Sequence, residues 1–183
     1  MAHDEISPAI LYWGTPVVLI STMNPDGSAN IGPMSLAWWL GHGCMVGLDA
    51  SSQTTQNMLR TKQCVLNLAS DSMAASVNAL ARPIGTDSAR ASKQDRGYQF
   101  VKDKFGCGLV LAIEVRILRV SSYEELRLNG FRNRNDADKW KPMIMMFCDW
   151  YGLKNGKLKH SRLAEVEEEM YRGLTETTGK IDA

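Results

Sequence analysis

The sequence predicts a single, mainly β domain: an antiparallel β-barrel with helices packed at its ends. Residues 16–23 form a β-branched apolar run, and an Asn-Pro-Asp-Gly turn at 24–27 follows it directly. Residues 108–120 place apolar side chains at the period of two that one face of a strand requires. A parallel α/β sheet would need a helix after nearly every strand, and this order of elements does not supply one.

The length of 183 residues fits one domain, since a domain averages about 150 residues. The first strand ends where Pro25 presets a turn dihedral and Gly27 supplies a left-handed position, so a hairpin is expected. The expected helix over 51–60 has cap-type residues in front and Met58 and Leu59 on its inward face. In chain order, the first half is predicted to contain strands over 16–23, 28–34, 44–48 and 64–68, a connection over 35–43, helices over 51–60 and 73–80, and a long strand over 108–120.

The later segments carry weaker patterns. The polar interval 82–104 is expected to be a mobile loop. Beyond the long strand, we expect a helical turn at 136–140, a strand at 143–147 and an acidic helix at 163–171. No repeat or low-complexity linker divides the chain, so 1–183 is predicted to be one domain.

The charge balance excludes binding that depends on bulk electrostatics. Lys and Arg number 21 and Asp and Glu 20, a formal net charge of +1, so nucleic acid and anionic membrane surfaces are not expected partners. The longest apolar stretch, 31–48, is interrupted by glycine, proline and histidine and is not expected to span a membrane.

Reactive side chains are few. The four cysteines (44, 64, 107 and 148) contain no C-x-x-C pair, so no metal site is expected. The histidines, His3, His42 and His160, stand apart, which leaves Ser-His-acid catalysis unsupported. The glycines of 41–47 lack the dinucleotide-binding spacing. Because residues 1–14 have no basic region followed by an apolar stretch, we expect a cytoplasmic protein with reduced thiols.

The segment 48–57 carries the strongest chemical pattern. Ser51, Ser52, Thr54 and Thr55 place four hydroxyls at the opening of the predicted helix. A helix N-terminus offers unpaired N–H groups and the positive end of the helix dipole, which together suit a phosphate. Helix capping alone explains one such hydroxyl, and it remains the alternative interpretation.

A second cluster lies at 30–39, Asn-Ile-Gly-Pro-Met-Ser-Leu-Ala-Trp-Trp. Glycine and proline stiffen a turn whose backbone groups stay free, and Ser35 adds a hydroxyl beside large apolar side chains. This combination suits the rim of a planar heteroaromatic ligand. For Trp38 and Trp39 the favoured alternative is a hydrophobic corner that closes the barrel or contacts a second copy.

These two segments resemble the flavin reductase-like, FMN-binding split-barrel family, which includes flavoredoxins and the small reductase components of two-component monooxygenases. The resemblance is carried by PVVLISTMNPDGSANIGPMSLAWWL and MVGLDASSQTTQNMLRTKQCVLNLAS, is close over 16–70 and is looser to about 120. It implies a mainly β split barrel with peripheral helices, with the region from about 121 to 183 packed on it as a C-terminal extension. The cofactor-binding residues that it implies are Asn30, Met34, Ser35, Leu36, Ala37, Asp49, Ala50, Ser51, Ser52, Thr54, Thr55 and Asn57.

The resemblance also implies a function. We expect a homodimer with FMN near the subunit interface, FAD being the other flavin left open. The flavin would be reduced by NADH or NADPH and would pass electrons to a partner monooxygenase. No residue is assigned a catalytic role, since the flavin itself would accept the hydride.

One segment departs from the family. Many of its reductases carry Gly-Asp-His after the long strand, where this chain reads Ser-Ser-Tyr-Glu-Glu-Leu-Arg-Leu at 121–128. Two alternatives therefore stay open: a flavoprotein that retains FMN and acts on another small molecule or carries electrons, and a non-catalytic flavin-binding module.

Overall fold

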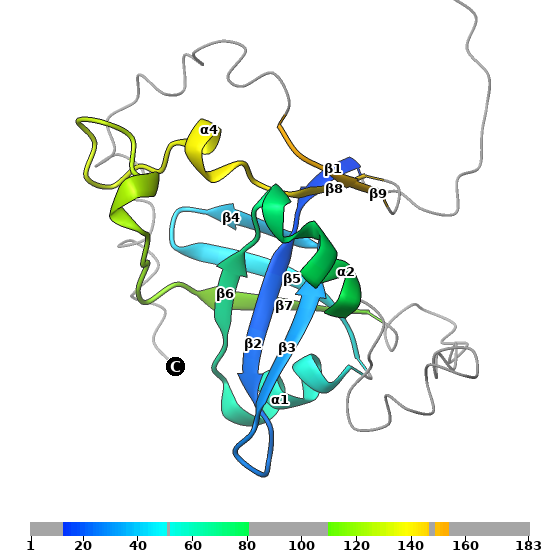
Figure 1. Ribbon diagram of the computed structural model, residues 1–183. Coiled ribbons are helices and arrows are strands. Elements are labelled where there is room, and N and C mark those ends of the chain that lie inside the picture. The colour runs from blue at the N-terminus through cyan, green and yellow to red at the C-terminus, as the bar shows by residue number, and fades with distance from the viewer. Residues whose placement is uncertain (1–12, 51, 81–109, 147–148, 154–183) are drawn as a thin grey trace, which may run out of the picture.

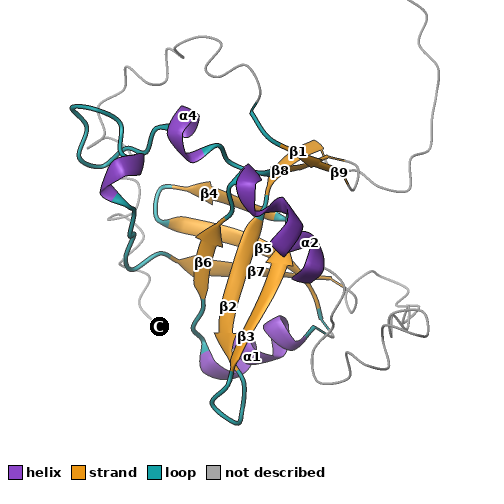
Figure 2. Ribbon diagram, in the orientation of Figure 1, coloured by secondary structure: helices purple, strands orange, loops and turns teal. Residues whose placement is uncertain are grey.

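The computed structural model describes residues 13–50, 52–80, 110–146 and 149–153. It is mainly β, with short helices at the margins (Figures 1 and 2). Its strands form three antiparallel three-stranded sheets that do not close into a full barrel. The mainly β prediction is therefore confirmed. The expected elements at 82–104 and 163–171 lie outside the described residues.

The first sheet has the order β3-β2-β6. β2 (Val18–Met23) pairs with β3 (Ala29–Met34) across the predicted turn and with β6 (Val65–Leu68) on its other side. In the turn, the Asp26 carboxylate accepts hydrogen bonds from Ser28 Oγ at 2.6 Å and Ser28 N at 2.9 Å. These bonds lower the pKa of the Asp26 carboxyl because they favour its charged form.

The second sheet has the order β4-β5-β7 and corrects one prediction. The connection expected over 35–43 contains a strand, β4 (Ala37–Leu40), which pairs with β5 (Gly43–Asp49). Gly41 has a φ of 58° in the tight turn between them, and a left-handed residue at that point allows the chain to reverse. β7 (Val110–Arg116) pairs with β5 and ends four residues before the predicted limit.

The third sheet has the order β1-β8-β9. The predicted strand over 16–23 is divided: β1 (Trp13–Pro16) pairs with β8 (Ile144–Met146), and β2 begins at Val18 in another sheet. At the change of sheet, Val17 N donates to Met143 O at 3.0 Å. β9 (Asp149–Tyr151), which pairs with β8, was not predicted.

Short helices connect the sheets. α1 (Gln53–Thr61) follows β5, and η1 (Asp71–Met73) leads into α2 (Ala74–Leu80). η3 (Glu124–Leu126) was not predicted, whereas α4 (Ala137–Trp140) is the helical turn expected at 136–140 and is capped by Asp136. None of the helices within the described residues is both long and apolar enough to cross a membrane.

β2 is buried on both faces and separates two core clusters. Val18 and Ile20 face a cluster that includes Val46 and Met58, while Val17 and Leu19 face a second one. Burial of the whole run explains why it is apolar at nearly every position instead of alternating.

The first core cluster also holds two free thiols, Cys44 and Cys64. Burial raises the pKa of Cys44 to about 11, with a smaller contribution from the neighbouring Cys64, and burial raises the pKa of Cys64 as well. Both thiols therefore stay neutral near pH 7, which favours a packing role. The other two cysteines lie outside the described residues.

Candidate flavin-binding site

Side chains from the first turns of α1 form hydrogen bonds that stabilise its N-terminus. Ser52 is the N-cap, and its Oγ accepts a hydrogen bond from Thr55 N at 3.1 Å. Thr55 Oγ1 donates to Asp49 O at 2.6 Å, and Gln56 Nε2 donates to Ala50 O at 2.8 Å. The link from β5 to α1 is therefore held by the helix that follows it.

The predicted hydroxyls differ in their surroundings. Ser52 is half-buried, whereas Thr54 and Thr55 are buried, with Thr55 0% exposed. Ser52 Oγ and Thr55 Oγ1 lie 2.8 Å apart and share a hydrogen bond. Ser51 lies outside the described residues. Of the described hydroxyls, Ser52 is the one that combines a cap position with exposure.

α1 packs against β3 at a glycine. A Cβ added at Gly32 would lie 2.6 Å from Thr54 Oγ1, so this approach requires the absence of a side chain. Asn30 Nδ2 donates to the same Thr54 oxygen at 3.0 Å. The two segments predicted to bind one ligand, 30–37 and 49–57, thus meet directly.

The other end of the first segment packs on β5. Gly47 N donates to Leu36 O at 2.8 Å, and a Cβ at Gly47 would lie 3.2 Å from Leu36 Cβ. Leu36 N donates to Met34 Sδ at 3.2 Å, which fixes the turn between β3 and β4. Ser35 is half-buried and Ala37 is buried at the start of β4. The turn therefore packs on Gly47, which precedes Asp49, the last residue of β5, by two residues.

Asn57 has its amide fully engaged by the protein. Its Nδ2 donates to Thr22 Oγ1 at 3.1 Å and to Asn24 Oδ1 at 2.8 Å, and its Oδ1 accepts from Gln53 Nε2 at 3.0 Å. At 1% exposure, it anchors α1 to the β2–β3 hairpin. Sequence inspection missed its partner Thr22, although a polar residue at the inward period-two position of an apolar strand is a usable signal.

Among the described residues, the cations nearest to α1 in sequence, Arg60 and Lys62, lie at its C-terminal end. Arg60 is in the last turn, where its guanidinium donates to Met23 O, and Lys62 is the C-cap with a φ of 57°. Their backbones are therefore about 12 Å (Arg60) and about 15 Å (Lys62) along the helix from the cap, at about 1.5 Å per residue. An anion at the N-terminus would depend on the helix dipole and N–H groups instead of these side chains.

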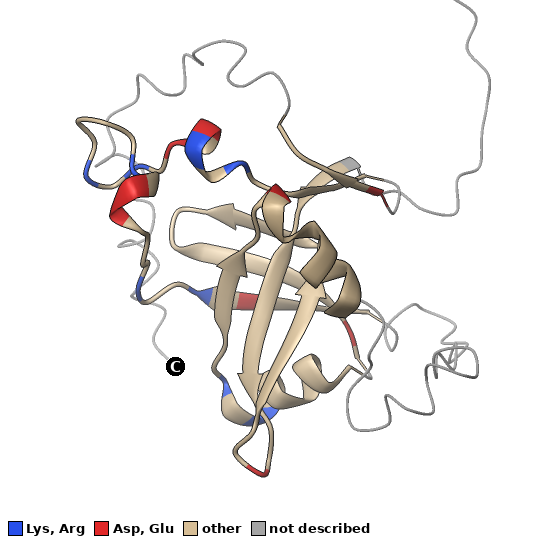
Figure 3. Ribbon diagram, viewed as in Figure 1, with Lys and Arg blue, Asp and Glu red and all other residues tan. Residues whose placement is uncertain are grey.

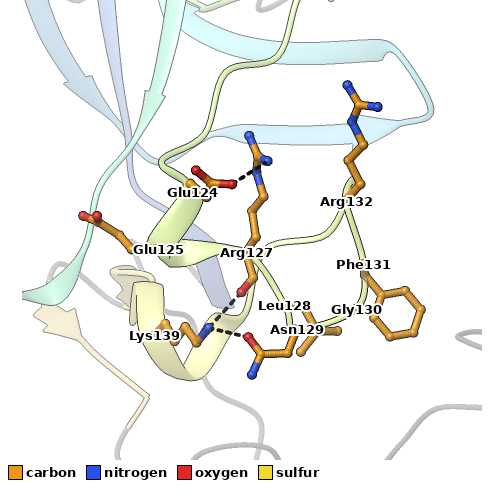
Figure 4. A pocket seen from close by; sticks show the side chains of 9 residues that line it. All are labelled: Glu124, Glu125, Arg127, Leu128, Asn129, Gly130, Phe131, Arg132 and Lys139. Carbon is orange, nitrogen blue, oxygen red and sulfur yellow. Dashed lines mark hydrogen bonds and ion pairs between the residues drawn. The ribbon is translucent and has the colours of Figure 1, made fainter.

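Most of the described charge gathers elsewhere. Acidic and basic residues cluster around η3 and α4, whereas β2, β3 and α2 contain no Lys, Arg, Asp or Glu (Figure 3). Between the segment 124–132 and Lys139 lies a wide, open hollow of about 490 Å³ (Figure 4). Lys139 Nζ donates hydrogen bonds there to Arg127 O at 2.9 Å and to Asn129 Oδ1 at 3.2 Å. The described residues contain no group of three His, Cys, Asp or Glu side chains placed to hold a metal ion.

The contact between Gly32 and Thr54 yields the first prediction. Gly32→Ala should destabilise the protein by about 1–3 kcal/mol in urea unfolding, because Thr54 is held in place by Asn30 and cannot move aside freely. Thr54→Ala in the same background should recover part of the loss. Gly43→Ala is the matched control, since its Cβ would meet Leu40 O at 3.4 Å, an ordinary contact. Equal losses at the two glycines would contradict the close approach.

Comparisons with known proteins place this fold. No protein-family model matches the sequence. The chain is 28% identical to the uncharacterized protein YdfE of Bacillus subtilis (strain 168), over 81% of this chain and 88% of that one.

Several solved structures share this fold, among them a flavoredoxin, a monooxygenase component and an FMN-binding protein. The flavoredoxin of Methanosarcina acetivorans has a TM-score of 0.66 at 14% identity, covering 89% of this chain and 96% of that one. Nitrilotriacetate monooxygenase component B from Bacillus cereus has a TM-score of 0.65 at 15% identity, with coverage of 88% and 100%. The FMN-binding protein of Thermus thermophilus has a TM-score of 0.52 at 11% identity, with coverage of 87% and 98%. The fold is therefore that of the flavin reductase-like, FMN-binding split barrels, as the sequence resemblance implied.

Proposed function

We propose that this protein binds FMN between the segment 30–37, which includes the β3–β4 turn, and the N-terminus of α1, and that it acts as an NAD(P)H-dependent flavin reductase. One observation carries the proposal: the first turn of α1 lies against β3 at Gly32, which joins the two predicted flavin segments into one surface. The fold that this chain shares with a flavoredoxin and a monooxygenase component supports it.

The residues present fit a phosphate at the N-terminus of α1. This nine-residue helix begins with a half-buried Ser52, and its dipole directs positive potential toward the cap. We place the phosphate of FMN there, held by backbone N–H groups beside Ser52. Because Thr55 Oγ1 donates its hydrogen to Asp49 O, the Ser52 hydroxyl donates to Thr55 Oγ1 and serves as the cap. Thr55 and Asn57 then serve the site indirectly, by holding the β5–α1 link and the helix in place.

The ring of the flavin would lie against the turn that joins β3 to β4. Met34, Ser35, Leu36 and Ala37 form or flank this turn, whereas Asn30 lies earlier on β3, next to Thr54 of α1. Its backbone is fixed by the Gly47–Leu36 hydrogen bond, so its polar groups are preorganised for a planar ligand.

A bound flavin supplies the redox chemistry, since its ring accepts a hydride from a nicotinamide cofactor. The chain itself then has to bind the flavin, orient it and exclude water. These roles need no acid–base side chain, which agrees with a sequence that is poor in histidine and whose described thiols, the buried Cys44 and the half-buried Cys64, are neutral. Free thiols are also typical of the cytoplasm, where we place the protein.

Substitutions at Ser52 test the phosphate position. Ser52→Asp retains a good N-cap but places a carboxylate beside the phosphate, whereas Ser52→Asn retains the cap without charge. Ser52→Asp should weaken FMN relative to riboflavin by about tenfold or more, which corresponds to ~1.4 kcal/mol of repulsion. Titration of flavin fluorescence measures both affinities.

Ser52→Asn is the control and should leave the ratio of FMN to riboflavin affinity close to the wild-type value. Similar stability of the two variants in urea would show that the cap is intact in both. If Ser52→Asp weakened FMN and riboflavin equally, the phosphate would lie elsewhere.

Reduction by a nicotinamide cofactor tests the reaction. In the purified protein loaded with FMN, anaerobic NADH or NADPH should bleach the flavin absorbance, and NAD(P)H consumption in air should rise with added free FMN. A protein that holds FMN tightly but is bleached by neither donor would instead be a flavin-retaining flavoprotein. The segment 121–128 favours that second candidate, because η3 forms where related reductases carry Gly-Asp-His.

We also propose that two copies associate through the outer face of the β4–β5–β7 sheet. Trp38 and Leu40 are 61% and 64% exposed on its edge strand, a large apolar area to leave in water. Trp39, by contrast, packs against the first core cluster. A partner monooxygenase is the proposed recipient of the reduced flavin, as the similarity to a monooxygenase component B suggests.

Sedimentation equilibrium tests the dimer. The wild-type protein should have the mass of two chains, and Leu40→Gln should weaken the association because it places a polar group in the apolar contact. Val65→Gln, at a similarly exposed position on β6, is the control and should leave the mass unchanged. A wild-type mass of one chain at micromolar concentration would refute the dimer.

A further inference from the structure

The hydroxyl of Thr22 is the common acceptor of a polar network beneath the proposed site. Thr22 is on β2 and is 7% exposed. It lies two residues after Ile20, so its side chain is on the face of β2 that packs on the first core cluster. Its Oγ1 accepts from Asn30 Nδ2 at 3.0 Å and from Asn57 Nδ2 at 3.1 Å. A hydroxyl oxygen has two acceptor positions, and both are used here.

The side chain of Asn30 links Thr22 to the β3 side of the site. Asn30 Nδ2 donates to Thr22 Oγ1 and to Thr54 Oγ1, each at 3.0 Å, so one amide spans β2 and the first turn of α1. Because Gly32 has no side chain, Thr54 can come close enough to β3 for this bridge to form.

The side chain of Asn57 links Thr22 to the second turn of α1. Each Asn57 donor hydrogen has a partner, Thr22 or Asn24, and its oxygen accepts from Gln53 and, at 3.4 Å, from Arg60. The amide therefore cannot turn toward another acceptor without leaving a buried polar group unpaired, which costs more than the bond itself. α1 is thus held at two points, and Thr22 Oγ1 is the atom common to both.

We propose that Thr22 is a positioning residue for the flavin site: its hydroxyl sets where the N-terminus of α1 lies relative to β3. Thr22 does not contact the flavin in this proposal. It acts through Asn30 and Asn57, and the inference rests on the proposed function because the flavin is the ligand that spans the two segments.

Ligands of different length separate this role from simple stabilisation. In the proposed site, FMN contacts both the segment 30–37 and the cap of α1, so its affinity depends on the relative placement of these two parts. Lumiflavin, which has neither ribityl chain nor phosphate, contacts the turn alone. A change in the placement of α1 should therefore lower the affinity for FMN more than that for lumiflavin, whereas a general loss of stability lowers both alike.

The experiment compares the FMN to lumiflavin affinity ratio in wild-type protein, Thr22→Val and Thr22→Ser. Thr22→Val keeps the shape of the side chain but removes the shared acceptor, and the ratio should fall roughly fivefold or more. Thr22→Ser keeps the hydroxyl and should restore the ratio. Thr22→Ala serves in place of Thr22→Val if the valine variant does not fold.

Thr61→Val is the matched control. Thr61 Oγ1 donates to Asn57 O at 2.8 Å and accepts from Gln63 N at 3.2 Å, so this change removes hydrogen bonds at the C-terminal end of α1 without touching the link to β3. The FMN to lumiflavin affinity ratio of Thr61→Val should equal that of the wild type, even if the variant is less stable. If Thr22→Val left the ratio unchanged, or if Thr61→Val lowered it equally, the positioning role would be overturned while the proposed function stood. A wild-type protein that binds neither flavin would overturn both.

Discussion

The arrangement of this protein depends on the contact between the first turn of α1 and β3. At Gly32 the two elements approach so closely that no side chain fits between them, and Thr54 occupies the space. Its hydroxyl, the amide of Asn30 and the hydroxyl of Thr22 then form a continuous chain of hydrogen bonds from helix to sheet. Within a buried site such bonds specify geometry strongly, since each unpaired group would incur a desolvation penalty.

The two core clusters explain why this contact can be rigid. Residues 17–20, at the start of β2 and just before it, are buried on both faces. β2 therefore cannot shift without disturbing Val18 and Ile20 on one side or Val17 and Leu19 on the other. α1 contributes Met58 to the first cluster, which seats the helix by apolar packing before its polar groups are aligned. Apolar burial supplies the stability, and the amide and hydroxyl groups select one orientation.

The sequence predicted the elements whose signals are local. The β2–β3 hairpin follows from an apolar β-branched run and an Asn-Pro-Asp-Gly turn, and α1 follows from its Ser-Thr cap region. β4 was missed because Trp38 and Leu40 face outward and do not give the usual alternation of buried apolar and exposed polar residues. The division of 16–23 into β1 and β2 was also missed, because Val17 changes sheets through bonds to distant backbone groups at Met143 and Ala69.

The sequence by itself determined which segments bear the candidate chemistry: hydroxyls at a helix start and a stiff turn between two strands. Only the tertiary structure decided the part each side chain takes. Ser52 remains half-buried at the cap, whereas Thr55 and Asn57 are buried with partners inside the protein, and Thr22 joins the network from a strand. The physical reason is that residue type and spacing fix local backbone geometry, while the choice of hydrogen-bond partner depends on packing between distant residues, such as Thr22 and Asn57, which are 35 positions apart in the chain.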